Sequence, residues 1–291
     1  MKKLLLLTSV IGLLISCKKE TNLIAGNEPE IHKELYGSWI GQPEDYVIYS
    51  KNEFHKGIID KTDGISQFNI IIEKITAKGI EGKTIMNGNE KSIKGNLSET
   101  KDSLIVTLND PINSKNAGVY SIKIKNNGLN GNWKPNDKNS KTTLIKLYDF
   151  KKKQFTYNPK LMLAPTEIIE QEMPYELYVD YLTLEKNSDG AFRDADENIV
   201  TKINSSTTKL VENDLKKYKK IDLQILKNTI YARHGLIFKD AVTRQFFNYS
   251  KWYIPFTNSI DAKLTPLEKE NIAMLEKFEK YATDNYDNFG R

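Results

Sequence analysis

Between residues 35 and 150, short segments rich in Ile, Val and Thr alternate apolar and polar positions. This two-residue period is typical of strands that bury one face. Asn-Gly and Asp-Gly pairs interrupt the pattern about every 10–12 residues, as hairpin turns do. We therefore expect an antiparallel β-meander that closes into a small barrel or sandwich. Its expected strands are 68–75, 79–86, 92–97, 104–108, 119–124 and 142–148, after an opening at 37–39, with turns at 63–64, 87–88, 127–128 and 130–131.

Two Gly-x-Trp triplets stand at the ends of this region. Gly37-Ser38-Trp39 resembles the opening of lipocalin-type barrels, and a barrel of that kind would enclose a small apolar ligand. Gly131-Asn132-Trp133 repeats the pattern near the other end. A tryptophan beside a turn in a meander more often fills the core, and we expect that role for Trp133.

A helical period replaces the alternation after residue 222. Leu223, Leu226 and Ile230 fall on one helix face, and Asp222 is a suitable N-cap. Gly235 can adopt the left-handed conformation that ends a helix. This pattern predicts a helix over Leu223–His234.

Two further helices are expected downstream. Phe238, Val242, Phe246 and Phe247 indicate a short one. Thr265-Pro266-Leu267-Glu268 combines a capping box with proline at the first helical position and so predicts a helix start. Its expected inward face is Leu267, Met274, Leu275, Phe278 and Tyr281. The overall expectation is an α+β chain with an N-terminal β domain and a small C-terminal helical domain.

The C-terminal region carries three ordered motifs. They are Tyr231-Ala232-Arg233-His234-Gly235, Trp252-Tyr253-x-Pro255 and Glu270-Asn271-Ile272. Together they resemble the YARHG domain family over roughly Leu210 to Tyr281. Members usually have Arg-Asn-Glu-Ile before the motif, where this chain has Lys227-Asn228-Thr229-Ile230. The resemblance implies a small extracytoplasmic helical domain and no established activity.

The first seventeen residues predict the compartment. Lys2 and Lys3 precede an apolar stretch, 4–15, that is too short for a stable membrane span. Leu14-Ile15-Ser16-Cys17 then resembles a bacterial lipobox, which implies a lipid on Cys17. Lys18-Lys19-Glu20 partly matches the tag that sends some Bacteroidetes lipoproteins to the cell surface. We therefore expect an outer-membrane lipoprotein that faces the periplasm or the cell surface. The lipid on Cys17 would attach it to the membrane.

Composition shifts divide the chain into six expected segments. After the signal peptide, the polar stretch that follows would act as a flexible tether with a reach of roughly 20–25 Å. Three prolines interrupt the connector between the two domains, in which 175–184 could form an edge strand. The segments are the signal peptide 1–16, the lipidated tether 17–34, the β domain 35–150, the connector 151–207, the helical domain 208–283 and the tail 284–291.

Charge and motif content restrict the chemistry. The chain has 43 basic and 38 acidic residues that are interspersed, which gives no support for nucleic-acid binding. Its three histidines, His32, His55 and His234, lie in separate regions, and its one cysteine is the expected lipidation site. We therefore predict no metal site and no cofactor. The chain also lacks the Gly-x-Ser-x-Gly and His-Glu-x-x-His patterns of known hydrolases.

Tyr231, Arg233, His234, Trp252 and Tyr253 are the candidate binding residues. They could line a shallow groove for a carboxylate or sugar ligand, since Arg and aromatic residues are common at recognition surfaces. Alternatively, Arg233 and His234 bond the last helix carbonyls and pair with Glu268 or Glu270, while Trp252 and Tyr253 pack over the same helix. We expect the second, structural arrangement.

Three functional classes follow. The first is a non-enzymatic lipid-anchored envelope protein whose YARHG-like domain binds or scaffolds a cell-wall, glycan or protein partner. The second is a lipocalin-like carrier, which requires a continuous apolar cavity in the β domain. The third is an envelope hydrolase, which a cleft with paired carboxylates or a coupled His–acid pair would favour.

Overall fold

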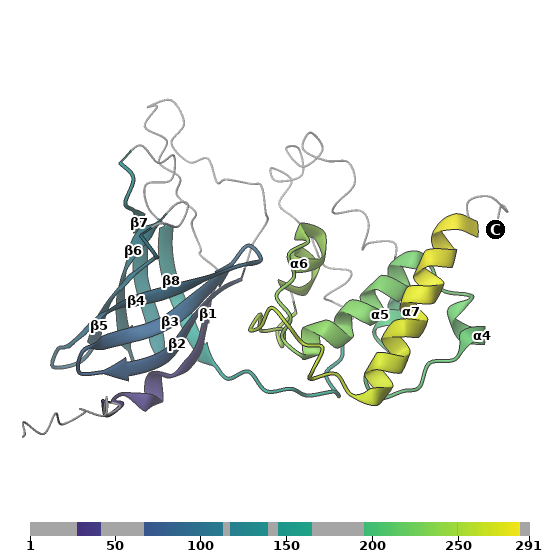
Figure 1. Cartoon of the computed structure of the whole chain (residues 1–291), viewed down its shortest axis with the longest axis horizontal. Coiled ribbons are helices and arrows are strands. Elements are labelled where there is room, and N and C mark those ends of the chain that lie inside the picture. Colours follow the sequence, from purple (N-terminus) through teal and green to yellow (C-terminus); the bar gives the residue numbers. More distant parts are fainter. Residues whose placement is uncertain are drawn as a thin grey trace, which may run out of the picture.

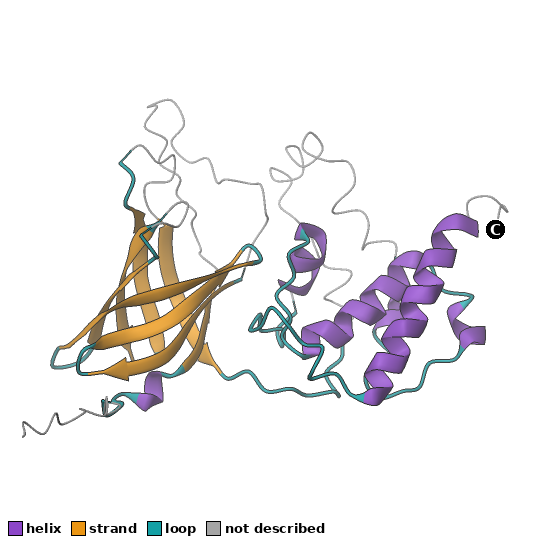
Figure 2. Cartoon of the chain, viewed as in Figure 1, coloured by secondary structure: helices purple, strands orange, loops and turns teal. Residues whose placement is uncertain are grey.

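The computed structural model describes residues 28–41, 67–112, 117–138, 145–164, 195–248 and 250–285. Two bodies stand side by side, a β-barrel and a group of helices (Figures 1 and 2). The fold is therefore α+β, as the two hydrophobic periods predict. None of the helices within the described ranges is long and apolar enough to cross a membrane. The predicted lipidation site Cys17 and the possible edge strand 175–184 lie outside the described residues.

Eight antiparallel strands close into an up-and-down barrel in which each strand pairs with its neighbours in sequence and β1 pairs with β8. This is the strand order of lipocalin-type barrels. The strands are β1 (Gly37–Gly41), β2 (Phe68–Thr76), β3 (Gly79–Met86), β4 (Asn89–Glu99), β5 (Leu104–Asn109), β6 (Gly118–Lys125), β7 (Gly128–Pro135) and β8 (Ile145–Lys153).

Every expected strand is present, but the sequence analysis missed β7. The Asn127-Gly128 turn is correct, and Asn126 and Asn127 both have positive φ. The expected turn at Asn130-Gly131 is wrong, because both residues lie inside β7. A Cβ on Gly131 would come within 2.3 Å of the Ser121 carbonyl oxygen on β6. This glycine therefore allows two strands to approach closely and does not mark a turn.

The described interior of the barrel is filled by large apolar side chains. Phe68 contacts both Tyr120 and Phe150, with ring centroids 6.1 and 5.7 Å apart. Trp39 is fully buried and donates from Nε1 to the Leu35 carbonyl of the 3-10 helix η1 (Lys33–Leu35), 3.0 Å away. Trp133 belongs to the same core, as predicted. Large rings therefore line the described interior, and η1 packs against Trp39 at one end of the barrel.

Asp110 organises the end of the barrel opposite η1. It is buried and accepts hydrogen bonds from the Gly118 amide at 3.0 Å and from Trp133 Nε1 at 2.9 Å. The Tyr120 hydroxyl lies 3.5 Å from its other oxygen. One carboxylate thus joins the β5–β6 connection to β7.

The segment before β1 is attached to the barrel. Glu30 forms a bridge with Thr76, and the Ile31 amide donates to the Ile75 carbonyl at 3.0 Å. The Tyr36 hydroxyl accepts from the Ile75 amide at 2.9 Å. The expected tether to residue 34 therefore meets the barrel at about residue 30.

The helical body comprises α3 (Glu197–Val200), α4 (Glu212–Leu215), α5 (Lys220–Arg233), α6 (Ala241–Asn248) and α7 (Pro266–Asn285). The helices α5 and α7 lie against each other (Figure 1). Their contact is an apolar layer of Leu223, Leu226, Ile230, Ile272, Leu275 and Phe278.

Two details of these helices differ from expectation. α5 begins at Lys220, and Asp222 caps it from the third position by accepting the Lys219 amide at 2.9 Å. A capping residue can act from inside the first turn, so the carboxylate alone does not mark the boundary. On α7, Tyr281 is 54% exposed and is not part of the inward face, whereas the polar Glu268 and Asn271 are fully buried there.

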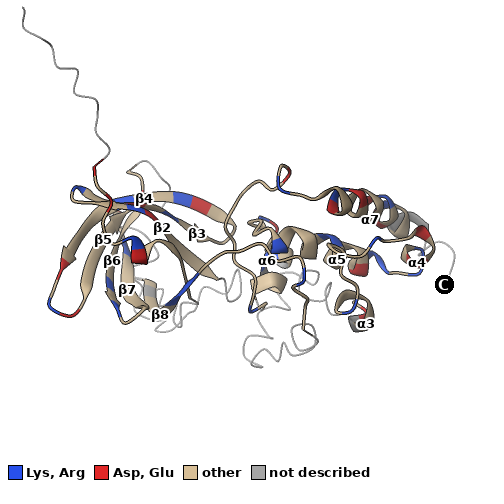
Figure 3. Cartoon of the chain, turned by 90° about the horizontal axis from the view of Figure 1, so that it is seen from below, with Lys and Arg blue, Asp and Glu red and all other residues tan. Residues whose placement is uncertain are grey.

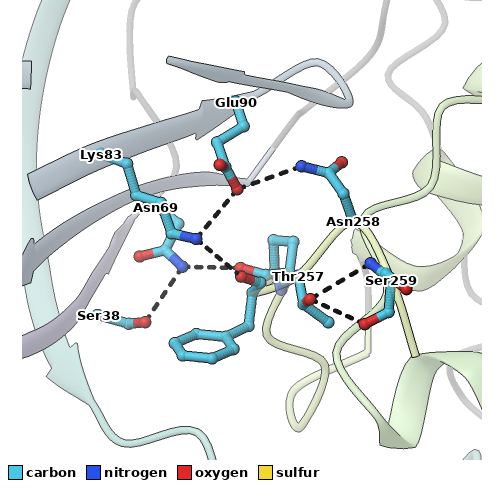
Figure 4. A network of polar contacts seen from close by, with 9 residues as sticks. Ser38, Asn69, Lys83, Glu90, Thr257, Asn258 and Ser259 are labelled. Carbon is cyan, nitrogen blue, oxygen red and sulfur yellow. Dashed lines mark hydrogen bonds and ion pairs between the residues drawn. The ribbon is translucent and has the colours of Figure 1, made fainter. Parts of the chain in front are cut away.

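The two bodies meet on the outer face of β1–β3. Ile71 and Ile85 pack with Ile237, and Phe256 covers the same contact. Asn69 donates to the Pro255 carbonyl at 2.8 Å and to Ser38 Oγ at 3.2 Å (Figure 4). At the rim, Glu90 accepts from Lys83 at 3.0 Å and from Asn258 at 3.3 Å. The junction thus combines a small apolar centre with directed polar bonds.

Both described ends of the connector belong to the helical body. Phe155 stacks on Phe256 with ring centroids 5.0 Å apart, and Leu163 and Val200 are buried in the core around Phe247. The chain therefore leaves the barrel after β8 and packs at once against residues more than 70 positions later. The expected boundaries at 150 and 208 remain predictions.

Candidate functional site

Arg233 occupies the last turn of α5 and is 1% exposed. Its Nε donates to the Leu161 carbonyl at 2.7 Å, and one terminal nitrogen donates to Ser206 Oγ at 2.9 Å. The other terminal nitrogen lies 3.6 Å from Met162 Sδ. The expected structural role is thus present with different partners, because the acceptors come from the connector and not from the end of α5.

The charge of Arg233 survives this burial. Desolvation lowers its pKa to about 10, while the nearby Glu268 and Tyr157 favour the charged form. Arg233 is therefore a cation at neutral pH. A buried cation is tolerated only when its donors are satisfied, and the connector supplies the acceptors for Arg233. The same hydrogen bonds hold the connector against α5.

His234 continues the cluster one residue further on. Its Nε2 lies 2.9 Å from Glu268 Oε2, and the two side chains are 3% and 0% exposed. Tyr157 stacks on the imidazole with ring centroids 4.2 Å apart and donates its hydroxyl to Glu268 Oε1 at 3.1 Å. Of the two expected acid partners, Glu268 is confirmed. Glu270 is wrong, because it pairs with Lys209 at the surface.

Glu268 joins this cluster to the start of α7. It accepts the Thr265 amide at 2.9 Å, while its own amide donates to Thr265 Oγ1 at 3.2 Å, which is the predicted capping box. Burial alone would raise its pKa, but hydrogen bonds from His234, the Thr265 backbone and Ser206 lower the pKa to about 2. The carboxylate is therefore ionised throughout the neutral range.

Asn271, one turn later on α7, fixes the loop before α4. Its Oδ1 accepts the Leu210 amide at 3.0 Å, and its Nδ2 donates to the Ser205 and Thr208 carbonyls at 2.8 Å each. We refer to Tyr157, Ser206, Arg233, His234, Glu268 and Asn271 as the buried polar network. It connects four separate segments of the chain.

The three aromatic candidates pack around this network. Trp252 Nε1 donates to the Met162 carbonyl at 2.9 Å, beside the Arg233 contact. Tyr253 is 1% exposed and donates to the Leu236 carbonyl at 2.7 Å. Tyr231 is half-buried between the two helical cores, and burial raises its pKa to about 12. All five candidates are therefore engaged within the fold, and Arg233, His234 and Trp252 are brought together through the connector.

The His234–Glu268 pair has the composition of an acid–base dyad, and its geometry limits that use. Within the described ranges, the imidazole hydrogen-bonds the Glu268 carboxylate, and the nearby Ser206 hydroxyl hydrogen-bonds Arg233 and Glu268. Tyr157 covers one face of the ring. A nucleophilic mechanism needs a base in contact with a nucleophile near substrate, so this arrangement supports a structural role.

Sequence reasoning missed part of the network. Tyr157, Leu161 and Ser206 carry no local pattern that points to Arg233, since their contacts span 27 to 111 positions. Asn271 was visible only as part of the family motif in the last helix.

Replacing Arg233 with Ala should lower the free energy of unfolding by about 2–4 kcal/mol, because it leaves the Leu161 carbonyl and Ser206 without their donor. Urea unfolding followed by tryptophan fluorescence measures this. Lys209→Ala, which removes an exposed ion pair, is the control and should change stability by less than about 0.5 kcal/mol. A loss for Arg233→Ala as small as the control's would exclude the structural role.

The depressed pKa of Glu268 makes part of the stability dependent on pH. Its contribution is fully present above pH 4.5, the ordinary pKa, and is lost as pH falls towards 2. Glu268→Gln should therefore be less stable than the wild type by up to about 3 kcal/mol at pH 7. That difference should shrink between pH 4.5 and 2. A constant difference in urea titrations across this range would contradict the linkage.

Comparison with known proteins supports the C-terminal assignment. The model of the YARHG domain matches residues 188–280, which begins before the Leu210 boundary of the motif resemblance and takes in α3. No curated protein and no solved structure matches the chain. The chain thus carries a YARHG domain at residues 188–280, and the arginine and histidine of its name-giving motif lie in the buried polar network.

Proposed function

We propose that this protein is a non-enzymatic, lipid-anchored component of the cell envelope that presents its barrel and YARHG domain as a joined body for binding or scaffolding. The observation that carries the proposal is that the motif side chains make their contacts inside the fold: Arg233 binds the connector and His234 binds α7. On this proposal, a partner binds exposed residues of the barrel or of the helical domain and not the motif side chains.

The anchor rests on the N-terminal sequence. Two lysines, an apolar stretch and Leu14-Ile15-Ser16-Cys17 stand in the order that a lipoprotein signal requires. The described chain begins at residue 28, near the η1 end of the barrel (Figure 1). On this proposal, a lipid at Cys17 holds that end of the barrel near the membrane. The outer membrane is the expected location, facing the periplasm or the cell surface.

Cys17→Ala should abolish incorporation of radioactive palmitate and release the protein from the outer-membrane fraction, or leave it as the unprocessed precursor. Fractionation and labelling of cells that express each form measure this. An alanine variant that is still labelled and still sediments with the outer membrane would rule out the anchor.

A lipocalin-like carrier is the second candidate function, because the barrel has eight strands in up-and-down order. The described interior weighs against it. Phe68 contacts both Tyr120 and Phe150 inside the barrel, and Trp39 is fully buried beside η1. An apolar ligand would have to displace several of these rings.

A further inference from the structure

The barrel has a large excess of positive charge. Residues 67–153 include sixteen lysines, eight acidic residues and no arginine. Residues 195–285, which contain the helices, have fifteen basic and twelve acidic residues. Figure 3 shows basic positions on several strands of the barrel. The net charge of +5 for the whole chain is therefore smaller than the excess carried by residues 67–153.

The excess does not lie on β3 and β4. There, Lys94 pairs with Glu81 at 3.0 Å and Lys83 pairs with Glu90 at 3.0 Å. Opposite charges on neighbouring strands thus neutralise this part of the barrel. The second of these pairs also lies at the junction with the helical body.

Four exposed lysines share the outer face of β6–β8. Lys123 and Lys125 alternate with buried residues on β6, Lys134 is exposed on β7, and Lys151 is exposed on β8. The strands are adjacent, and Gly128 on β7 stands between Lys125 and Lys151 in the register. Asp149 is the one acidic residue in these three strands, and it pairs with Lys151. The β4–β5 turn adds Asp102, which pairs with Lys125 at 2.6 Å.

Polar and aromatic side chains fill the spaces between the lysines. Asn130 is opposite Lys123 and accepts the Asp149 amide at 2.9 Å through Oδ1, which leaves its Nδ2 as the donor for a ligand, and Asn132 is opposite Ser121. Tyr148 on β8 is 57% exposed, one of few large apolar side chains at the described surface. We call Lys123, Lys125, Lys134, Lys151, Asn130, Asn132 and Tyr148 the lysine face. It offers cations, amides and one flat ring on a single surface.

We propose that the lysine face binds an acidic polysaccharide, a linear glycan whose sugars carry carboxylates. The ammonium groups pair with carboxylates, the amides bond sugar hydroxyls, and the Tyr148 ring packs on the apolar face of a sugar. This inference rests on the proposed function, because it names the partner class of an envelope scaffold.

The shape of the surface favours a glycan over a lipid bilayer. The outside of a small barrel is convex, so a flat membrane touches few residues at once. A flexible linear polymer can follow the curve and contact β6, β7 and β8 together. Several weak ion pairs then act in combination on one chain, although each exposed pair contributes little.

The test uses the full chain in non-ionic detergent and titrates it with polygalacturonate. Neutral dextran, duplex DNA and micelles containing phosphatidylglycerol are the comparison ligands. One variant combines Lys123→Gln, Lys134→Gln and Lys151→Gln. Its matched control, Lys217→Gln with Lys220→Gln and Lys263→Gln, removes the same charge from exposed positions of the helical body. Circular dichroism verifies that each variant is folded.

Polygalacturonate should bind with an affinity that falls as salt rises, and dextran should not bind. The lysine-face variant should weaken binding about tenfold, and the control by less than about twofold. Tyr148→Ala should weaken it severalfold at unchanged charge.

No binding of polygalacturonate would overturn the proposal, as would equal losses in the two triple variants. So would equal binding of DNA or phosphatidylglycerol micelles combined with no effect of Tyr148→Ala. These results are independent of the anchor, because fractionation depends on Cys17 and not on the lysine face.

Discussion

Burial of the Arg233 guanidinium is the constraint on which the C-terminal half depends. A charged group without solvent must have its donors satisfied, and here the acceptors are the Leu161 carbonyl and the Ser206 hydroxyl. His234 adds Glu268 and thereby the start of α7. The connector, the loop before α4, α5 and α7 are consequently held by one network. The hydrogen bonds of the motif fix the relative positions of the four segments. Apolar packing, which is not directional, fixes these positions less tightly.

The connector and the segment around Phe256 attach the helical domain to the barrel. The connector follows directly from β8 and packs on Phe256 through Phe155, while Phe256 covers Ile71 and Ile85 on the barrel. Asn69 adds a directed bond to the Pro255 carbonyl. The helical domain is therefore fixed to the barrel on one side, through β1–β3. Among the described residues, the contacts of this junction do not include the outer face of β6–β8, and this division of surfaces underlies the glycan proposal.

Local sequence patterns predicted the helices and strands more accurately than they predicted the contacts between them. Alternation identified the strands because each buries one face, but β7 was missed because Gly131 reflects close strand approach and not a turn. The capping box predicted both the start of α7 and the role of Glu268. Helical periodicity placed Tyr281 inside, although that ring is 54% exposed in the structure. Arg233 was expected to be structural, yet its acceptors lie in the connector, where no spacing rule identifies them.

Native-state hydrogen exchange of the full chain tests the central claim most directly. If the buried polar network joins the four segments, amides in 157–163 and 204–210 should open together with those at the end of α5 and the start of α7, with one shared free energy of opening. Exchange of 157–163 at the rate of an unstructured peptide, while α5 and α7 stay protected, would contradict the account.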